Sequence, residues 1–429
     1  MYQYRNYQQE EKVKNFRVFK LHSFESLSKI HIFILNETAK SGYKFHIMFK
    51  YFTFVSTKLH NMKLAKALLL LVFMNAAAQD NFNLIVGTYT NACASKGIYV
   101  YDFNVNTLEY KLKSNTDGVI NPSYLTVSSD KKFVYSVNED GKKSTVSAFK
   151  YAPATGKLDL INKTDSKGAD PCYIINDDKN VIVANYSGGS IAVFERKPDG
   201  SLSDAKQVVQ HTGSGTNKSR QESAHVHMVY FSPDNKYVFA NDLGTDKVYM
   251  YTYNPNGGAK TLVLKGSIDV KPGSGPRHLV FNPNGIFVYL LQELDGTLTT
   301  FSYENETLVK VDEASVAPAI FGGKNGGADI HFSKDGKYLY ATNRMDGNSI
   351  STFRVHSNGK INLIQQISTQ GVGPRNFTMD PNDNYVLVAN QNTNNIIIFK
   401  RDKSTGLLTD TGKKIELCQP VCLVFTPNK

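Results

Sequence analysis

The chain has 429 residues, a formal net charge of +11 at pH 7 and no tryptophan. Residues 1–78 carry 12 Lys and Arg against 4 Asp and Glu, whereas residues 79–429 carry 37 against 34, so most of the basicity lies in the first segment. The absence of a basic stripe beyond residue 78 argues against nucleic acid as a partner, and four cysteines in so long a chain exclude a disulfide-stapled mini-protein.

The first segment reads as a leader. Met62–Lys66 is a short basic start, Ala67–Met74 is apolar without interruption, and small residues follow. This pattern predicts a secretory signal peptide at 62–78, and its apolar run is too short for a stable membrane span; a buried helix is the alternative. We therefore expect a periplasmic or secreted protein, cytoplasmic if the signal interpretation fails, and interpret residues 1–61 as a disordered, non-native upstream extension.

Residues 79–429 read as short strands separated by turn signals, and they contain a repeat. A phrase of two small or basic residues followed by an apolar run recurs seven times, starting at residues 122, 171, 226, 276, 327, 374 and 420. A second strand phrase follows six of them, ending in Asn138, Asn185, Asn241, Gln292, Asn343 and Asn390. Seven repeats of about 50 residues predict a single all-β domain over 79–429, a seven-bladed β-propeller of four-stranded antiparallel blades; two stacked β-sandwiches are the alternative.

The seventh repeat ends after one strand. Its three missing strands are predicted at the other end of the domain, at Asn83–Thr90, Gly97–Phe103 and Leu108–Ser114. The closure blade should therefore combine one C-terminal with three N-terminal strands. Cys93 and Cys418 both fall in loops of this blade, and we expect either a disulfide between them, which export permits, or two free thiols.

Polar residues of the two phrases are predicted to meet at one mouth of the central channel, because the inner strand of a blade begins where the second strand ends. Residues 79–429 contain six histidines, and four of them lie at or just after the inner-strand starts. Bases, acids and several arginines at one mouth suit acid/base chemistry on an anionic substrate. The candidate catalytic residues are His225, His227, Arg277 and Glu293, and the candidate substrate-binding residues are His278, Asp329, Arg344, Arg375, Asn376 and Gln391.

Other interpretations of these residues stay open. His225 and His227 are spaced as a metal pair, but no third ligand at fixed spacing accompanies them, so we do not expect a metal site. Arg277 and Arg375 could instead tie neighbouring blades together. The glycine-rich segment Phe321–Gly327 could offer backbone N–H groups to a phosphate or could be only a mouth loop.

Several motifs resemble those of the seven-bladed propeller lactonase family, which includes the bacterial 6-phosphogluconolactonase of propeller type and is related to carboxy-cis,cis-muconate cyclase. The resemblance spans residues 83–427 and is carried by the segments Val86–Thr90, Lys96–Tyr99, Asn121–Leu125, Ala184–Gly189, Glu222–His227, Gly275–His278, Ala328–His331, Pro374–Phe377 and Val388–Gln391.

The resemblance implies hydrolysis of a small anionic sugar lactone in carbohydrate metabolism, without a cofactor. By motif it assigns catalysis to His225 or His227, to Arg277 and to Glu293, and substrate binding to Arg344. Water would attack the lactone carbonyl, with Glu293 or a histidine as base and Arg277 stabilising the oxyanion. Arg375, with Arg344, would hold a phosphate or carboxylate.

The substrate implied by the resemblance and the compartment predicted by the leader do not match. The substrate 6-phosphogluconolactone arises in the cytoplasm, whereas the leader predicts export, so another sugar lactone is the alternative. A non-catalytic ligand- or protein-binding propeller and a muconate-type lactonising cyclase are the competing functions. We expect a monomer.

Overall fold

The computed structural model describes residues 80–317 and 320–429. The predicted extension (1–61) and the predicted signal peptide (62–78) lie outside the described residues. Helical structure in the described part consists of three 3-10 turns, η1 (Gly141–Lys143), η2 (Gly258–Lys260) and η3 (Gln391–Thr393). None of the helices there is long and apolar enough for a bilayer crossing.

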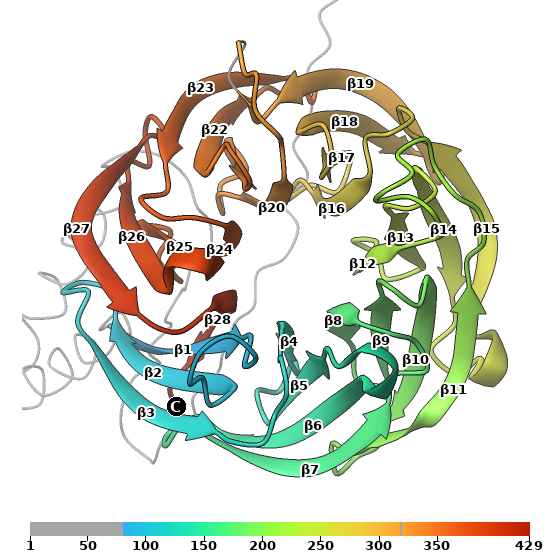
Figure 1. Ribbon diagram of the computed structural model, residues 1–429, viewed down its shortest axis with the longest axis horizontal. Coiled ribbons are helices and arrows are strands. Elements are labelled where there is room, and N and C mark those ends of the chain that lie inside the picture. Colours follow the sequence, from blue (N-terminus) through green and yellow to red (C-terminus); the bar gives the residue numbers. More distant parts are fainter. Residues whose placement is uncertain (1–79, 318–319) are drawn as a thin grey trace, which may run out of the picture. The chain divides into compact units, whose positions relative to one another are not determined.

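The described strands form seven antiparallel sheets of four strands each, arranged around a ring (Figure 1). Each sheet is a blade, named here by its innermost strand, so the predicted seven-bladed propeller is confirmed. Six blades use four consecutive strands from the centre to the rim: β4 (Tyr124–Val127), β5 (Phe133–Asn138), β6 (Thr145–Ala152), β7 (Lys157–Asp165); β8 (Pro171–Asn176), β9 (Asn180–Asn185), β10 (Ser190–Arg196), β11 (Leu202–Gln210); β12 (Val226–Phe231), β13 (Tyr237–Asp242), β14 (Lys247–Tyr253), β15 (Leu262–Asp269); β16 (Pro276–Phe281), β17 (Phe287–Gln292), β18 (Thr297–Glu304), β19 (Thr307–Ser315); β20 (Gly327–Phe332), β21 (Tyr338–Asn343), β22 (Ser349–Val355), β23 (Ile361–Ser368); β24 (Pro374–Met379), β25 (Tyr385–Asn390), β26 (Asn395–Arg401), β27 (Leu408–Glu416).

The closure blade joins the two ends of the propeller sequence, as predicted. Its order is β28-β1-β2-β3, with β28 (Pro420–Pro427) innermost, followed by β1 (Asn81–Thr88), β2 (Ile98–Asn104) and β3 (Tyr110–Thr116). β3 begins two residues later than expected because Leu108 lies in a turn, with a φ of 60° and its N–H donated to the carbonyl of Asn104.

A disulfide links Cys93 with Cys418 in the closure blade, with 6.2 Å between their Cα atoms. Cys93 lies between β1 and β2, and Cys418 lies between β27 and β28. The bond therefore connects parts of the chain that are 325 residues apart. Cys172 and Cys422 are buried free thiols.

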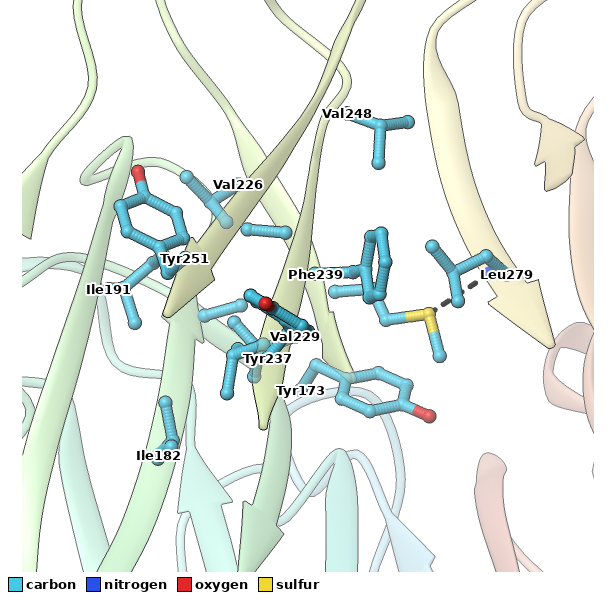
Figure 2. Packing of buried hydrophobic residues seen from close by; sticks show 14 of the residues in the cluster. Tyr173, Ile182, Ile191, Val226, Val229, Tyr237, Phe239, Val248, Tyr251 and Leu279 are labelled. Atoms are coloured by element: carbon cyan, nitrogen blue, oxygen red, sulfur yellow. Dashed lines mark hydrogen bonds between the residues drawn. The ribbon is translucent and has the colours of Figure 1, made fainter. Parts of the chain in front are cut away.

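Apolar residues on facing sides of neighbouring blades form the core. In one cluster Ile182 of β9, Val229 of β12 and Phe239 of β13 pack together with Leu279 of β16 (Figure 2). The backbone N–H of Leu279 also donates to the sulfur of Met228 at 3.1 Å, across the boundary between two blades. Each such side chain contributes about 1.5–3 kcal/mol when buried, and because the burial partners lie in adjacent blades, a single blade cannot form its core alone.

A tyrosine–glycine contact repeats between adjacent blades. The hydroxyls of Tyr135, Tyr289 and Tyr340, each in the second strand of a blade, donate to the carbonyl oxygens of Gly200, Gly359 and Gly406 in the outer hairpin of the next blade, at 3.1, 2.9 and 2.7 Å. All three glycines have positive φ, between 79° and 85°. At Gly359 a Cβ atom would also overlap the ring of Phe287, so this close approach requires glycine.

A backbone hydrogen bond ties the end of the second strand to the start of the inner strand at the mouth, the face of the ring at which the inner strands begin. The residue after the second strand donates its N–H to the carbonyl before the inner strand: Tyr89 to Gln419, Glu139 to Asn121, Tyr186 to Asp170, Leu243 to His225, Glu293 to Gly275, Arg344 to Gly326 and Gln391 to Gly373. The two recurring phrases therefore do meet at one face of the ring.

Candidate active site

All ten predicted site residues belong to the described part of the chain and lie on the β12, β16, β20 and β24 blades. His225 precedes β12, in which His227 lies; Arg277 and His278 begin β16, Asp329 lies in β20, and Arg375 and Asn376 begin β24; Glu293, Arg344 and Gln391 each directly follow a second strand. The structure divides these residues into two side-chain networks and leaves His225, Arg375 and Gln391 outside both.

Glu293 is the centre of the first network. Its side chain is 5% exposed, its Oε2 accepts a hydrogen bond from Arg277 Nε at 2.9 Å, and the same oxygen lies 2.8 Å from Arg344 Nη2. Its Oε1 accepts a hydrogen bond from Arg220 Nη2 at 2.5 Å. Three guanidinium groups thus surround one carboxylate, which leaves the network with an excess of positive charge.

Arg220 is a member of this network that sequence reasoning missed. It lies in the connection between β11 and β12, which is 15 residues long, whereas the other connections between blades have 3 to 11 residues. The signal was present in the repeat, because the interval from residue 171 to residue 226 is the longest one. Arg220 also donates to the hydroxyl of Tyr186 at 3.1 Å.

The two predicted histidines at the start of the β12 blade, His225 and His227, differ in their hydrogen bonds. Both ring nitrogens of His225 face oxygen acceptors, with Nδ1 3.0 Å from the carbonyl of Tyr186 and Nε2 3.0 Å from Glu222 Oε1. His227 is also buried, but its Nδ1 has no hydrogen-bond partner, and its Nε2 lies 3.9 Å from Glu293 Oε2. Nδ1 of His227 therefore has no partner among the described residues, whereas both ring nitrogens of His225 face oxygen atoms.

Asp329 is the centre of the second network. Its Oδ1 is 2.9 Å from His278 Nδ1, and its Oδ2 is 2.9 Å from His331 Nε2. The other nitrogen of His278, Nε2, lies 3.3 Å from Arg277 Nη1. This last contact joins the Asp329 network to the Glu293 network.

The remaining predicted residues are placed differently. Asn376 Nδ2 donates to Asp329 Oδ2 at 2.6 Å, and Asn376 Oδ1 accepts from the backbone N–H of Leu423 in β28 at 2.7 Å, so both polar ends of this side chain are used within the ring. Gln391 begins η3 and is held through its backbone N–H, which donates to Gly373. Among the described residues, the side chain of Gln391 makes no hydrogen bond with a member of either network.

Arg375 lies over the ring of Tyr89, with its guanidinium carbon 5.3 Å from the ring centroid. The hydroxyl of Tyr89 donates to Glu139 Oε1 at 3.0 Å, and burial raises the pKa of Glu139 while Arg375 opposes this shift. Tyr89 and Glu139 both follow second strands, and they bring the closure blade and the β4 blade into the mouth.

The charges of the Glu293 network follow from its geometry. Burial alone would raise the pKa of Glu293, but Arg344, Arg277 and Arg220 outweigh it and hold this pKa well below its usual range. Burial also lowers the pKa of His227 well below its usual value, and the charge of Arg277 adds to this effect. At neutral pH the mouth therefore holds an ionised carboxylate, protonated arginines and a neutral imidazole.

This arrangement supports polar chemistry on an anionic or carbonyl-bearing ligand. Guanidinium groups can stabilise a developing oxyanion, and a neutral histidine can accept a proton from water. Within residues 80–317 and 320–429, no group of three or more His, Cys, Asp and Glu side chains is placed to hold a metal ion.

Comparison with known proteins places the chain in one family. Residues 83–425 match the family described as "Lactonase, 7-bladed beta-propeller". The chain is 39% identical over 332 residues to a 6-phosphogluconolactonase of Formosa agariphila, which covers 76% of this chain and 94% of the relative.

Two solved structures extend the comparison. One is from Bacteroides fragilis, reported as a candidate 6-phosphogluconolactonase, with 44% identity, a TM-score of 0.78 and coverage of 82% of this chain and 99% of that one. The other is a periplasmic gluconolactonase of Pseudomonas aeruginosa, with 36% identity, a TM-score of 0.77 and coverage of 81% and 100%. The chain therefore belongs to the family of seven-bladed β-propeller lactonases related to 6-phosphogluconolactonase.

Proposed function

We propose that this protein hydrolyses a sugar lactone of the 6-phosphogluconolactone type. The observation that carries the proposal is the buried Glu293 carboxylate, shared by three arginines and lying 3.9 Å from the neutral His227. Such a site offers positive charge for a carbonyl oxygen and an uncharged base for water, which ester-bond hydrolysis requires. Membership of the lactonase family supports the same reaction class.

His227 is the general base in this proposal. Its imidazole is neutral and has an unpartnered Nδ1, whereas both nitrogens of His225 face oxygen acceptors. Glu293 is a weaker choice because its arginine partners lower the pKa of its carboxyl group. We assign Glu293 the task of holding Arg277 and Arg344 in place.

The reaction proceeds by addition and elimination at the lactone carbonyl. A water oxygen bonds to the carbonyl carbon while His227 takes one of its protons, and Arg277 stabilises the resulting oxyanion. The bond from this carbon to the ring oxygen then breaks, and the imidazolium of His227 returns the proton to the departing alkoxide. The product is the open-chain acid, which releases its carboxyl proton to solvent.

We also propose that the protein acts after export. The disulfide between Cys93 and Cys418 suits an oxidising compartment, and the relative from Pseudomonas aeruginosa is described as periplasmic. A sugar lactone present outside the cytoplasm would then be the natural substrate, with or without a phosphate group.

The test is a substrate panel with purified protein comprising residues 79–429. Gluconolactone, its 6-phosphate and a muconate would each be followed by proton release or by loss of the starting compound, after subtraction of the spontaneous rate. Catalysed ring opening supports the proposal. Ligand binding without turnover would instead identify a binding propeller, and lactone formation from the muconate would identify a cyclase.

A further inference from the structure

Arg220 differs from the other two arginines that contact Glu293. Arg277 also donates to the carbonyl of Ala328, and Arg344 Nε donates to the carbonyl of Gly326 at 3.2 Å, so both are fixed to the backbone of the ring. Among the described residues, the guanidinium of Arg220 bonds only to side chains, those of Glu293 and Tyr186.

Exposure separates the three arginines in the same way. The side chain of Arg220 is 35% exposed, against 12% for Arg344 and 2% for Arg277. Arg220 is thus the guanidinium of this network that an incoming ligand meets at the solvent side, while the carboxylate behind it is 5% exposed.

The backbone that carries Arg220 is nevertheless anchored. The neighbouring Gln221 is fully buried, its Nε2 donates to the carbonyl of Leu243 at 2.8 Å, and its Oε1 accepts from the N–H of Asn217 at 3.0 Å. The connection can therefore keep its place while the long Arg220 side chain turns between partners.

We propose that Arg220 selects substrates that carry a phosphate group remote from the lactone carbonyl, by exchanging its bond to Glu293 for bonds to that phosphate. The proposal rests on the proposed function only for the identity of the substrate. Its physical basis is the surplus of positive charge, since three guanidinium groups face one carboxylate and a dianion would restore the balance. The planar guanidinium also matches phosphate oxygens with two parallel hydrogen bonds.

The exchange has a consequence for Glu293. Its Oε1 accepts a hydrogen bond from Arg220, and departure of Arg220 leaves this oxygen free to accept one from the attacking water. A phosphorylated substrate should therefore have a higher kcat and a lower KM than an uncharged lactone. With the uncharged lactone, Arg220 stays bonded to Glu293.

The experiment measures binding separately from turnover, with the full chain. Calorimetry gives the Kd values of gluconate 6-phosphate and gluconate for the wild type, Arg220→Gln, Arg220→Lys and the control Arg354→Gln, which alters an exposed arginine in β22. We expect the wild type and the control to prefer the phosphorylated acid, Arg220→Gln to lose about 10- to 100-fold of this preference, and Arg220→Lys to retain part of it.

Two outcomes would overturn the proposal: a wild type that binds both acids equally, or an Arg220→Gln protein that keeps the full preference with an unchanged melting temperature. Should Arg220→Gln fail to fold, Arg220→Lys decides by the same ratio. Hydrolysis rates measured with gluconolactone and its 6-phosphate test the lactonase assignment separately from the role of Arg220. A wild type without hydrolytic activity contradicts the lactonase assignment, while the binding ratio still decides whether Arg220 selects phosphate.

Discussion

Asp329 Oδ1 and His278 Nδ1 lie 2.9 Å apart across the boundary between the β20 and β16 blades, and this contact fixes the tautomer of the histidine. Burial and the charge of Arg277 lower the pKa of His278 to about 4, so the ring is neutral at pH 7. Because Nδ1 carries the proton donated to Asp329, Nε2 carries the lone pair that faces Arg277 Nη1 at 3.3 Å. Asp329 thus acts on the arginine through His278, as a positioning residue.

Asp329→Asn is the first prediction. The amide can donate to His278 Nδ1 and stabilise the other tautomer, in which Nε2 carries the proton. Two N–H donors, His278 Nε2 and Arg277 Nη1, would then face each other. We expect kcat/KM to fall about 10- to 100-fold, with the exposed Asp117→Asn as control. Nitrogen NMR of labelled histidine reports the tautomer directly, and an unchanged His278 signature in the variant would contradict this role.

Arg277→Ala and Glu293→Ala should each reduce lactone hydrolysis by at least about a hundredfold, because the first removes the group that stabilises the oxyanion and the second releases the arginines that Glu293 holds in place. The measurement is the steady-state rate with gluconolactone and its 6-phosphate. Glu304→Gln, at the exposed end of β18, is the matched control. Near-normal rates in a folded Arg277→Ala protein would refute the assignment.

The pH dependence should identify His227 as the base. Its pKa is lowered by burial and by Arg277, so the neutral, proton-accepting form persists into acid. We therefore expect kcat/KM to stay level as the pH falls from 8 to 6, and to decline only at lower pH. His227→Gln should abolish this activity while His225→Gln retains more of it; an inflection at or above pH 6.5 would speak against His227.

Gly359→Ala should destabilise the ring by about 2–4 kcal/mol, because the residue has a φ of 83° and its new methyl group would overlap Phe287. Denaturant unfolding measures the loss. Gly266→Ala is the matched control, since a Cβ at Gly266 meets open space and its φ is not positive. Equal stability of the two variants would show that the tyrosine–glycine contact tolerates a side chain.

Cys418→Ser should lower the free energy of unfolding by about 2–4 kcal/mol under oxidising conditions. The disulfide constrains a very long loop, and its loss frees the unfolded chain more than the folded one. In the presence of a reductant that opens the bond, wild type and variant should melt at the same temperature. A difference that persists there would assign the effect to packing around residue 418.

The ring, the closure blade and the gathering of polar residues at one mouth could be predicted because each follows from repeated local phrases and from the direction of adjacent strands. The repeated geometry of the blade then brings the starts of the inner strands and the ends of the second strands together. Arg220 lies outside these phrases, in an irregular connection whose path depends on the burial of Gln221. The roles of His225 and His227 could not be separated either, because the difference between them depends on the folded structure, in which His225 contacts Tyr186 and Glu222 while Nδ1 of His227 has no partner.

One series of hydrogen bonds at the mouth depends on β28, the strand that is synthesised after all the other described strands. Leu423 of β28 donates its N–H to Asn376, Asn376 donates to Asp329, and Asp329 orients His278. Because β28 follows the other 27 described strands along the chain, the bond from Leu423 to Asn376 that begins this series forms only after β28 has been made. We expect a nascent chain to remain inactive until its final strand pairs with its first, so that enzymatic activity reports completed folding.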